Sequence, residues 1–273
     1  VVCFRDCAYL IIDFRYIEKA KKIVSDCEVI LQESKSILQI HNLLKRHGVK
    51  RVSIEAHSMT IEMLSKYTKA MPDIEFDTSN QLSDAIYSLR TVKSIQEVEK
   101  IKQAQAIADE GFKHILQYIQ VGVTEKDIAL ELDYYMLKHG AEALSFDTIA
   151  LAGKNTSMPH GVPTDYKVQS GDFVLMDYGA VVDGYHSDMT RTICVGNPTD
   201  KMKDVYSTVL KAQLTAIDNI KVGISGSVGD SYAREVIKDA GYGDAFGHSL
   251  GHGVGMEIHE FPVMSPNCSA VLV

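Results

Sequence analysis

Two aspartates flank a predicted β-hairpin in the second half of the chain. An apolar strand that includes Asp177 runs into the turn signal Asp183-Gly184, and a second strand returns through Asp188. This spacing puts the two strand aspartates nearly opposite each other, with Cβ atoms ~5 Å apart if both lie on one face. A divalent cation between them would offset their repulsion and their desolvation. The alternative is that one aspartate faces solvent, because a β-bulge easily reverses a face.

Three histidines lie in a glycine-rich segment between Gly247 and Glu260. So many glycines disfavour a helix, and we expect extended or looped backbone. In such a chain His248 and His252 share a face, whereas His259 points away unless the chain bends. Neutral imidazole is the commonest metal ligand, so the cluster favours a metal or catalytic site. Ordinary surface or core histidines are the alternative.

A fourth histidine, His160, lies in a polar loop between Pro159 and Pro163. By itself it indicates no particular chemistry. Cys3 and Cys7 share strand parity, so we expect both thiols to be buried and assign them no role.

Alternating strands and helices predict a small α/β domain over residues 1–90. Strands are expected at 8–12 and 52–54, and a helix at 36–47 that is closed by Gly48. A long amphipathic helix begins near residues 90–93, so the second domain is predicted over residues 91–273.

A duplicated pattern organises residues 94–273. The matching landmarks lie 101 residues apart: Ile119–Thr124 with Ile220–Ser225, and Gly140 with Gly241. Thr124 and Ser225, the last residues of the two matching segments, suit helix N-caps. Gly140 and Gly241 suit the C-terminal ends of the helices that follow. We therefore predict an α+β domain with an internal pseudo-twofold repeat, each half containing a helix pair and strands.

The composition excludes several classes of protein. The 28 Lys and Arg against 36 Asp and Glu give a formal net charge of −8, without the basic tract that a nucleic-acid binder needs. No apolar run approaches the ~20 residues of a membrane span, and no signal peptide is visible. The 5 cysteines form no CxxC pair. We expect a soluble cytoplasmic protein with no nucleic-acid or membrane partner.

Five motifs occur in order along the second domain. They are Ser145-Phe-Asp-Thr-Ile149, Asn155-x-x-x-Pro159-His160-Gly-Val-Pro163, Met176-Asp177-Tyr-Gly-Ala180, Ser187-Asp188-Met-Thr-Arg-Thr192 and Gly251-His252-Gly-Val-Gly255-x-x-x-His259-Glu260. Together they resemble the Xaa-Pro aminopeptidase and prolidase branch of the pita-bread metallopeptidases. Asp13-Phe-Arg-Tyr16 is similar to part of the creatinase-like N-terminal domain that precedes the catalytic domain in that branch.

The resemblance implies a site for two divalent cations, with manganese expected first and cobalt or zinc as alternatives. In the family two aspartates, one histidine and two glutamates bind them. The matching metal ligands here are Asp177, Asp188 and His252. Other family histidines orient the substrate and stabilise the tetrahedral intermediate. The residues implied in these substrate-binding and catalytic roles are His160, His248 and His259, with Phe146 as a further substrate contact.

The sequence departs from the family pattern in one respect. No position up to Val273 matches the two glutamate ligands, because Glu257 and Glu260 lie in the segment of His259. We therefore expect the sequence to be a piece of a longer protein. The implied enzyme is a homodimer that hydrolyses the bond between an N-terminal residue and proline.

Two other functions fit the same fold. One is a creatinase-type amidinohydrolase, which uses no metal. The retention of Asp177, Asp188 and His252 argues against it. The other is a pita-bread protein that has lost catalysis and binds partners.

Overall fold

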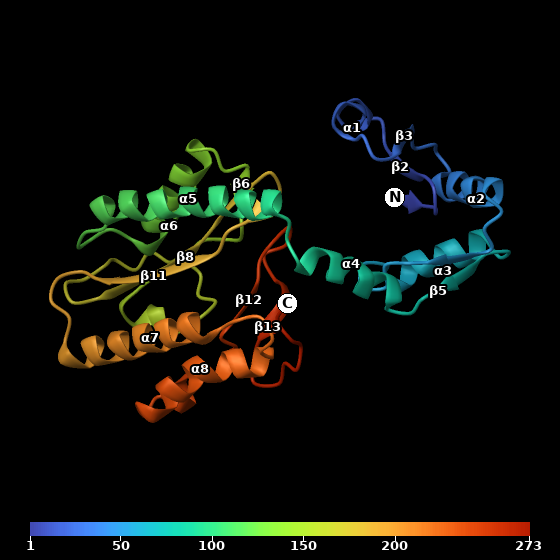
Figure 1. The fold of residues 1–273 in the computed structure, drawn as a ribbon. Helices are drawn as coiled ribbons and strands as arrows, with labels where there is room; N and C mark the ends of the chain where they lie inside the picture. Colours follow the sequence, from blue (N-terminus) through green and yellow to red (C-terminus); the bar gives the residue numbers. More distant parts are fainter. The chain divides into compact units, whose positions relative to one another are not determined.

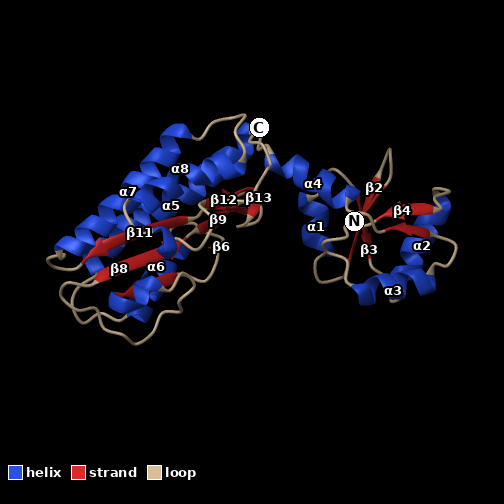
Figure 2. Cartoon of the chain, turned by 90° about the horizontal axis from the view of Figure 1, so that it is seen from below, coloured by secondary structure: helices blue, strands red, loops and turns tan.

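The computed structural model describes residues 1–273, and the chain forms two units, Val1–Ile86 and Tyr87–Val273 (Figure 1). Each unit has its own helices and strands (Figure 2). No helix is both long enough and apolar enough to cross a bilayer.

The first unit combines short strands with helices. β1 pairs antiparallel with β2, β2 pairs parallel with β3, and β4 pairs parallel with β5. The predicted strand at 8–12 is β2, and the predicted helix from Ser36 is α2, followed by Gly48 at a φ of 67°. The elements are β1 (Val2–Cys3), β2 (Ala8–Ile12), α1 (Ile17–Ile23), β3 (Glu28–Leu31), α2 (Ser36–Arg46), β4 (Arg51–Ser53), α3 (Ile61–Ala70), β5 (Glu75–Asp77) and α4 (Gln81–Thr91), whose last residues belong to the second unit.

The second unit contains two helix pairs and three small sheets. The sheets have the strand orders β11-β8-β7, β10-β9-β6 and β12-β13. Figure 1 shows α5 and α6 above the long β8 and β11 strands and α7 and α8 below them. The elements are α5 (Ile95–Tyr118), α6 (Glu125–Lys138), β6 (Ala143–Leu144), β7 (Ile149–Ala152), a 3₁₀ turn (Gly153–Ser157), β8 (Phe173–Tyr178), β9 (Ala180–Val182), β10 (Tyr185–His186), β11 (Met189–Cys194), α7 (Asp200–Asn219), α8 (Gly226–Asp239), a 3₁₀ turn (Gly243–Ala245), β12 (Gly251–Gly253) and β13 (Glu260–Met264).

The predicted duplication is present in three dimensions. Thr124 caps α6 by accepting the N–H of Asp127, and Ser225 caps α8 by accepting the N–H of Val228. Both helices have 14 residues, and the glycines that follow, Gly140 and Gly241, have φ values of 109° and 84°. Only glycine adopts such φ values without strain, so both helices stop at equivalent points.

The repeat also includes a returning segment after each helix pair. The N–H of Gly122 donates to the carbonyl of Val168 at 2.9 Å, and the N–H of Gly223 donates to that of Leu272 at 2.9 Å. Thr124 and Ser225 form the matching isolated bridges with Lys167 and Val271. Each turn before a capped helix is therefore fastened by a later segment of its own half.

The core of this unit fixes which way β8 faces. Val174, Met176 and Tyr178 are fully buried in one cluster with residues of α5 and α6, including Ile115. Side chains alternate along a strand, so Asp177 projects from the opposite face. The burial of the even-numbered residues thus directs a carboxylate away from the core.

A break at Gly179 bends the hairpin that carries both aspartates. A Cβ at Gly179 would lie 1.9 Å from the carbonyl oxygen of Ser187, so no larger residue fits there. On the returning strand Ser187 is buried, and its N–H donates to the carbonyl of Ala180 at 2.9 Å. The chain therefore leaves one sheet and enters the next at this point, and Asp188 lies in the gap between β10 and β11.

Candidate metal centre

Asp177 faces Thr190 across the β8–β11 pair. The predicted turn is present, with Asp183 and Gly184 at positive φ, and one register runs from the turn to Asp177. Asp188 lies two residues before Thr190, beyond the end of β11. It is therefore a diagonal neighbour of Asp177, and the expectation that the two aspartates lie nearly opposite each other holds to within two residues.

Both aspartates are costly to ionise. Burial is the largest influence on the Asp177 carboxyl and raises its pKa to about 6, and the charge of Asp188 acts in the same direction. A hydrogen bond to the Thr190 side chain and the imidazoles of His160 and His252 oppose that rise. Burial likewise raises the pKa of Asp188, against the influence of His252 and His259.

The chain bends between the two histidines of the last motif. β12 and β13 form a short antiparallel pair in which Gly253 lies opposite Glu260, with a register shift after His252. The rings of His252 and His259 lie 4.4 Å apart at 68°, and His252 Nε2 lies 3.5 Å from Asp188 Oδ2. The alternation of side chains along a strand did not show whether the chain bends here. The observed bend brings His259 next to His252.

His160 is exposed in the loop between β7 and β8, which a buried carboxylate anchors. Glu125, at the start of α6, has 0% exposure. Its Oε1 accepts the Ala152 N–H at 2.7 Å and the Asn155 amide at 2.8 Å. Its Oε2 accepts the N–H of Thr164 at 2.9 Å and the hydroxyl of Thr164 at 2.6 Å. Both ends of the His160 loop are thereby fastened to one side chain.

The remaining two predicted residues make no hydrogen bond or ring contact with the other site residues. His248 is exposed, its Nδ1 lies 2.8 Å from the Ser249 carbonyl, and its ring packs edge-on against Phe246 at 4.8 Å. Phe146 is half-buried, and its ring does not stack on the histidines of the centre. The structure therefore brings together Asp177, Asp188, His160, His252 and His259, but not His248 or Phe146.

A second buried carboxylate, for which the sequence predicted no role, holds the His259 segment. Glu260 Oε1 lies 2.6 Å from Arg90 Nη2 and Oε2 lies 2.8 Å from Lys93 Nζ. Burial would raise the pKa of Glu260, but the two cations hold it below its usual value. A Cβ at Gly255 would lie 2.4 Å from Glu260 Oε2, so the glycine-rich backbone wraps directly against this carboxylate.

The residues of the centre suit divalent cations. Asp177 Oδ1 is buried and has no hydrogen-bond partner. An unpaired buried carboxylate oxygen is costly, and a cation that it ligates would remove that cost. Asp177, Asp188 and His252 together offer the carboxylate and imidazole ligands that such ions accept.

Comparison with known proteins identifies the family. Residues 99–273 match the model of metallopeptidase family M24, and residues 1–92 match the creatinase/prolidase N-terminal domain. The chain belongs to family M24. The predicted family, the α+β pita-bread fold with its creatinase-like N-terminal domain, and the metallopeptidase class are confirmed.

Several M24 relatives carry informative names. The chain is 37% identical to an Xaa-Pro dipeptidase of Pyrococcus furiosus, over 97% of this chain and 76% of the relative. A solved Xaa-Pro dipeptidase from Bacillus anthracis has a TM-score of 0.94 and 39% identity, covering 99% of this chain and 75% of that one. A solved X-Pro aminopeptidase from Thermotoga maritima has a TM-score of 0.91 and 38% identity, covering 98% of this chain and 75% of that one.

Proposed function

We propose that the protein is a divalent-metal peptidase that cleaves the bond between an N-terminal residue and proline. The observation that carries the proposal is the unpaired, buried Asp177 Oδ1 beside Asp188 and His252. The names of the relatives supply the substrate class: they are Xaa-Pro dipeptidases and an X-Pro aminopeptidase.

The proposed metal ligands in this chain are Asp177, Asp188 and His252. When bound, divalent cations supply Lewis acidity and lower the pKa of water. The three ligands are carboxylates and an imidazole, which manganese, cobalt and zinc all accept, and manganese is the ion we propose. The two glutamates expected from the family have no match up to Val273.

The other histidines act on the substrate in this proposal. His160 and His259 are exposed, so their imidazoles can reach a bound peptide. Each can donate a hydrogen bond to the scissile carbonyl oxygen as negative charge develops there. Glu125 holds the loop that carries His160, and Glu260 holds the segment that carries His259. In this proposal the two glutamates thereby fix the positions of the two histidines. His248 and Phe146 are proposed as substrate contacts only because the family resemblance implies them.

Two further features belong to the proposal. The protein acts as a homodimer, and it works in the cytoplasm, where its 5 free cysteines stay reduced.

The test uses full-length protein freed of metal with a chelator and then supplied with Mn²⁺. We expect Ala-Pro hydrolysis to return with the metal and Asp188→Ala to lower its rate by orders of magnitude. His252→Ala should lose bound metal, whereas His160→Ala should keep the metal and lower kcat. Near-normal rates for Asp188→Ala would exclude the metal assignment, and equal metal loss in both histidine variants would exclude the division of roles.

The same assay separates the rival functions. A creatinase-type amidinohydrolase would hydrolyse creatine in the presence of chelator. A binding protein would fold with or without metal and would hydrolyse neither Ala-Pro nor creatine.

A further inference from the structure

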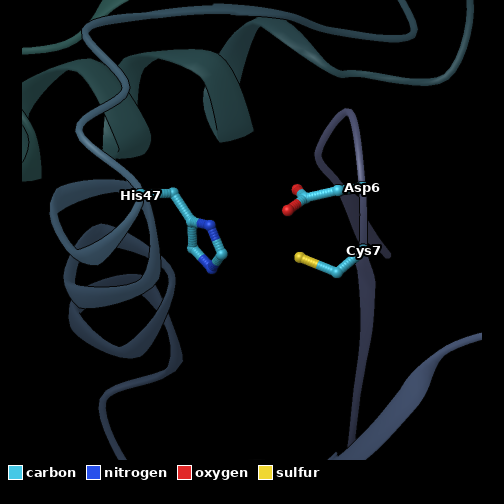
Figure 3. Close-up of side chains that lie close together, drawn as sticks. All are labelled: Asp6, Cys7 and His47. Carbon is cyan, nitrogen blue, oxygen red and sulfur yellow. The ribbon is translucent and has the colours of Figure 1, made fainter.

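A second group of metal-ligating side chains lies in the first unit, outside the peptidase centre. Asp6 and Cys7 come from the turn between β1 and β2, and His47 from the end of α2. One ligand atom of each lies within 4.8 Å of the others. Figure 3 shows the carboxylate, the thiol and the imidazole pointing toward one another. The expectation that Cys3 and Cys7 are buried is wrong, since Cys3 is exposed and Cys7 is half-buried.

The local backbone holds two of these ligands side by side. The N–H of Phe4 donates to the carbonyl of Cys7 at 2.8 Å, which closes a tight turn and presents Asp6 and Cys7 from adjacent positions. Asp6 is exposed and the other two side chains are half-buried, so an ion can reach them from solvent.

The imidazole is oriented by two aromatic neighbours. Phe4 stacks on the ring of His47 with centroids 4.0 Å apart, and the Tyr9 hydroxyl lies 3.2 Å from His47 Nε2. A metal-binding histidine usually donates its other ring N–H to a neighbouring group, which fixes the tautomer. An Nε2–H donated to Tyr9 leaves Nδ1 unprotonated, as a ligand nitrogen must be.

The ligand types indicate the class of metal. A thiolate, an imidazole and a carboxylate suit zinc, which takes four ligands and completes its shell with water when the protein supplies three. Manganese prefers oxygen ligands, so the two sites of this protein differ in the metals they favour.

We propose that Asp6, Cys7 and His47 form a zinc-type transition-metal site that fastens the β1–β2 turn to the end of α2. On binding, the Cys7 thiol loses its proton to solvent, and no redox step is involved. The site is independent of the peptidase activity proposed above.

The test is a cobalt titration of the full-length, chelator-treated protein. Thiolate-bound Co²⁺ has a near-ultraviolet charge-transfer band that carboxylate- and imidazole-bound Co²⁺ lacks, and the peptidase centre contains no cysteine. We expect the wild-type protein to show this band and Cys7→Ser to lose it completely. Cys3→Ser, which removes a thiol four residues away, is the matched control and should keep the band.

Two further variants examine the other ligands. Asp6→Asn, an exposed change that leaves the fold intact, should weaken zinc binding at this site. Tyr9→Phe should weaken it by about 10–100-fold, as loss of a group that orients a ligand does. The absence of a thiolate band in the wild-type protein, or an unchanged band in Cys7→Ser, would overturn the proposal. So would a band that disappears in Cys3→Ser alone. Ala-Pro hydrolysis with Mn²⁺ should be the same in Cys7→Ser as in the wild type, whatever its level.

Discussion

At the scale of single residues, the ionised Asp177 carboxylate is unfavourable in the metal-free fold. Burial is the main cause, and one carboxylate oxygen has no partner. A carboxyl whose pKa is raised to about 6 from 3.8 costs on the order of 3 kcal/mol when it is forced to ionise. The fold tolerates this cost at the position where a cation would cancel it.

This cost predicts an unusual dependence of stability on pH. In metal-free protein the folded state binds the extra proton between pH 3.8 and about 6, so this stabilisation is present at low pH and is lost as the pH rises through that window. Lowering the pH from about 7 to about 5 should therefore raise the Tm of the wild type relative to Asp177→Asn. Parallel Tm curves for the two proteins under chelator would contradict the prediction.

A second prediction at this scale concerns two glutamates that share Arg90. The Glu260 side chain is 3% exposed and also pairs with Lys93, whereas that of Glu257 is 55% exposed. Glu260→Gln should destabilise the fold by about 3–5 kcal/mol, because it removes the buried charge that the half-buried Arg90 and Lys93 share. Glu257→Gln should cost at most about 1 kcal/mol. Chemical denaturation of both variants measures the difference, and equal losses would mean that Glu260 has no special role.

At the scale of elements, the sequence predicted the parts that depend on local chemistry. Thr124 and Ser225 are N-caps, and Asp183-Gly184 forms the turn, because caps and tight turns are decided within a few residues. The register opposite Asp177 follows from the same turn, because the pairing of Val182 with Tyr185 continues as that of Asp177 with Thr190. The division into two sheets at Gly179 was not predictable in this way, because a break of that kind leaves no trace in the alternation of apolar residues.

The buried carboxylates were missed for a related reason. Glu125 directly follows an N-cap, where an acidic residue is usually exposed and interacts with the helix dipole. Only the tertiary structure shows that the loop from Ala152 to Thr164 folds over it. In the same way, the motif that includes Glu260 does not show that this side chain is buried whereas that of Glu257 is exposed.

The Glu125 anchor predicts a change in the His160 loop. Glu125→Gln replaces an acceptor oxygen by an amide that faces N–H donors, so it should destabilise the second unit by about 1–3 kcal/mol. Hydrogen exchange of residues 152–164 should increase, and kcat should fall more than KM rises. Asp165→Asn, in the same loop but with a side chain that is 85% exposed, is the control. The same exchange pattern in both variants would show that Glu125 does not anchor the loop.

At the scale of the whole molecule, the two units should respond differently to manganese. The oxygen-rich centre lies in Tyr87–Val273, and a ligand that binds only the folded state stabilises it by about 2.7 kcal/mol at 100 times its Kd. Limited proteolysis with mass spectrometry should show that Mn²⁺ slows cleavage within residues 87–273 and leaves cleavage within residues 1–86 unchanged. Asp188→Asn should abolish this protection, and uniform protection of both units would contradict the assignment.

The internal repeat divides the proposed ligand set between two halves of one chain. The first copy contributes Asp177 and Asp188, and the second contributes His252, whose Nε2 lies 3.5 Å from Asp188 Oδ2. Neither copy alone holds this ligand set, so the centre exists only where the two copies meet. The same backbone pattern therefore carries different side chains in the two copies. The difference is visible where Glu125 of the first copy corresponds to Gly226 of the second, 101 residues later.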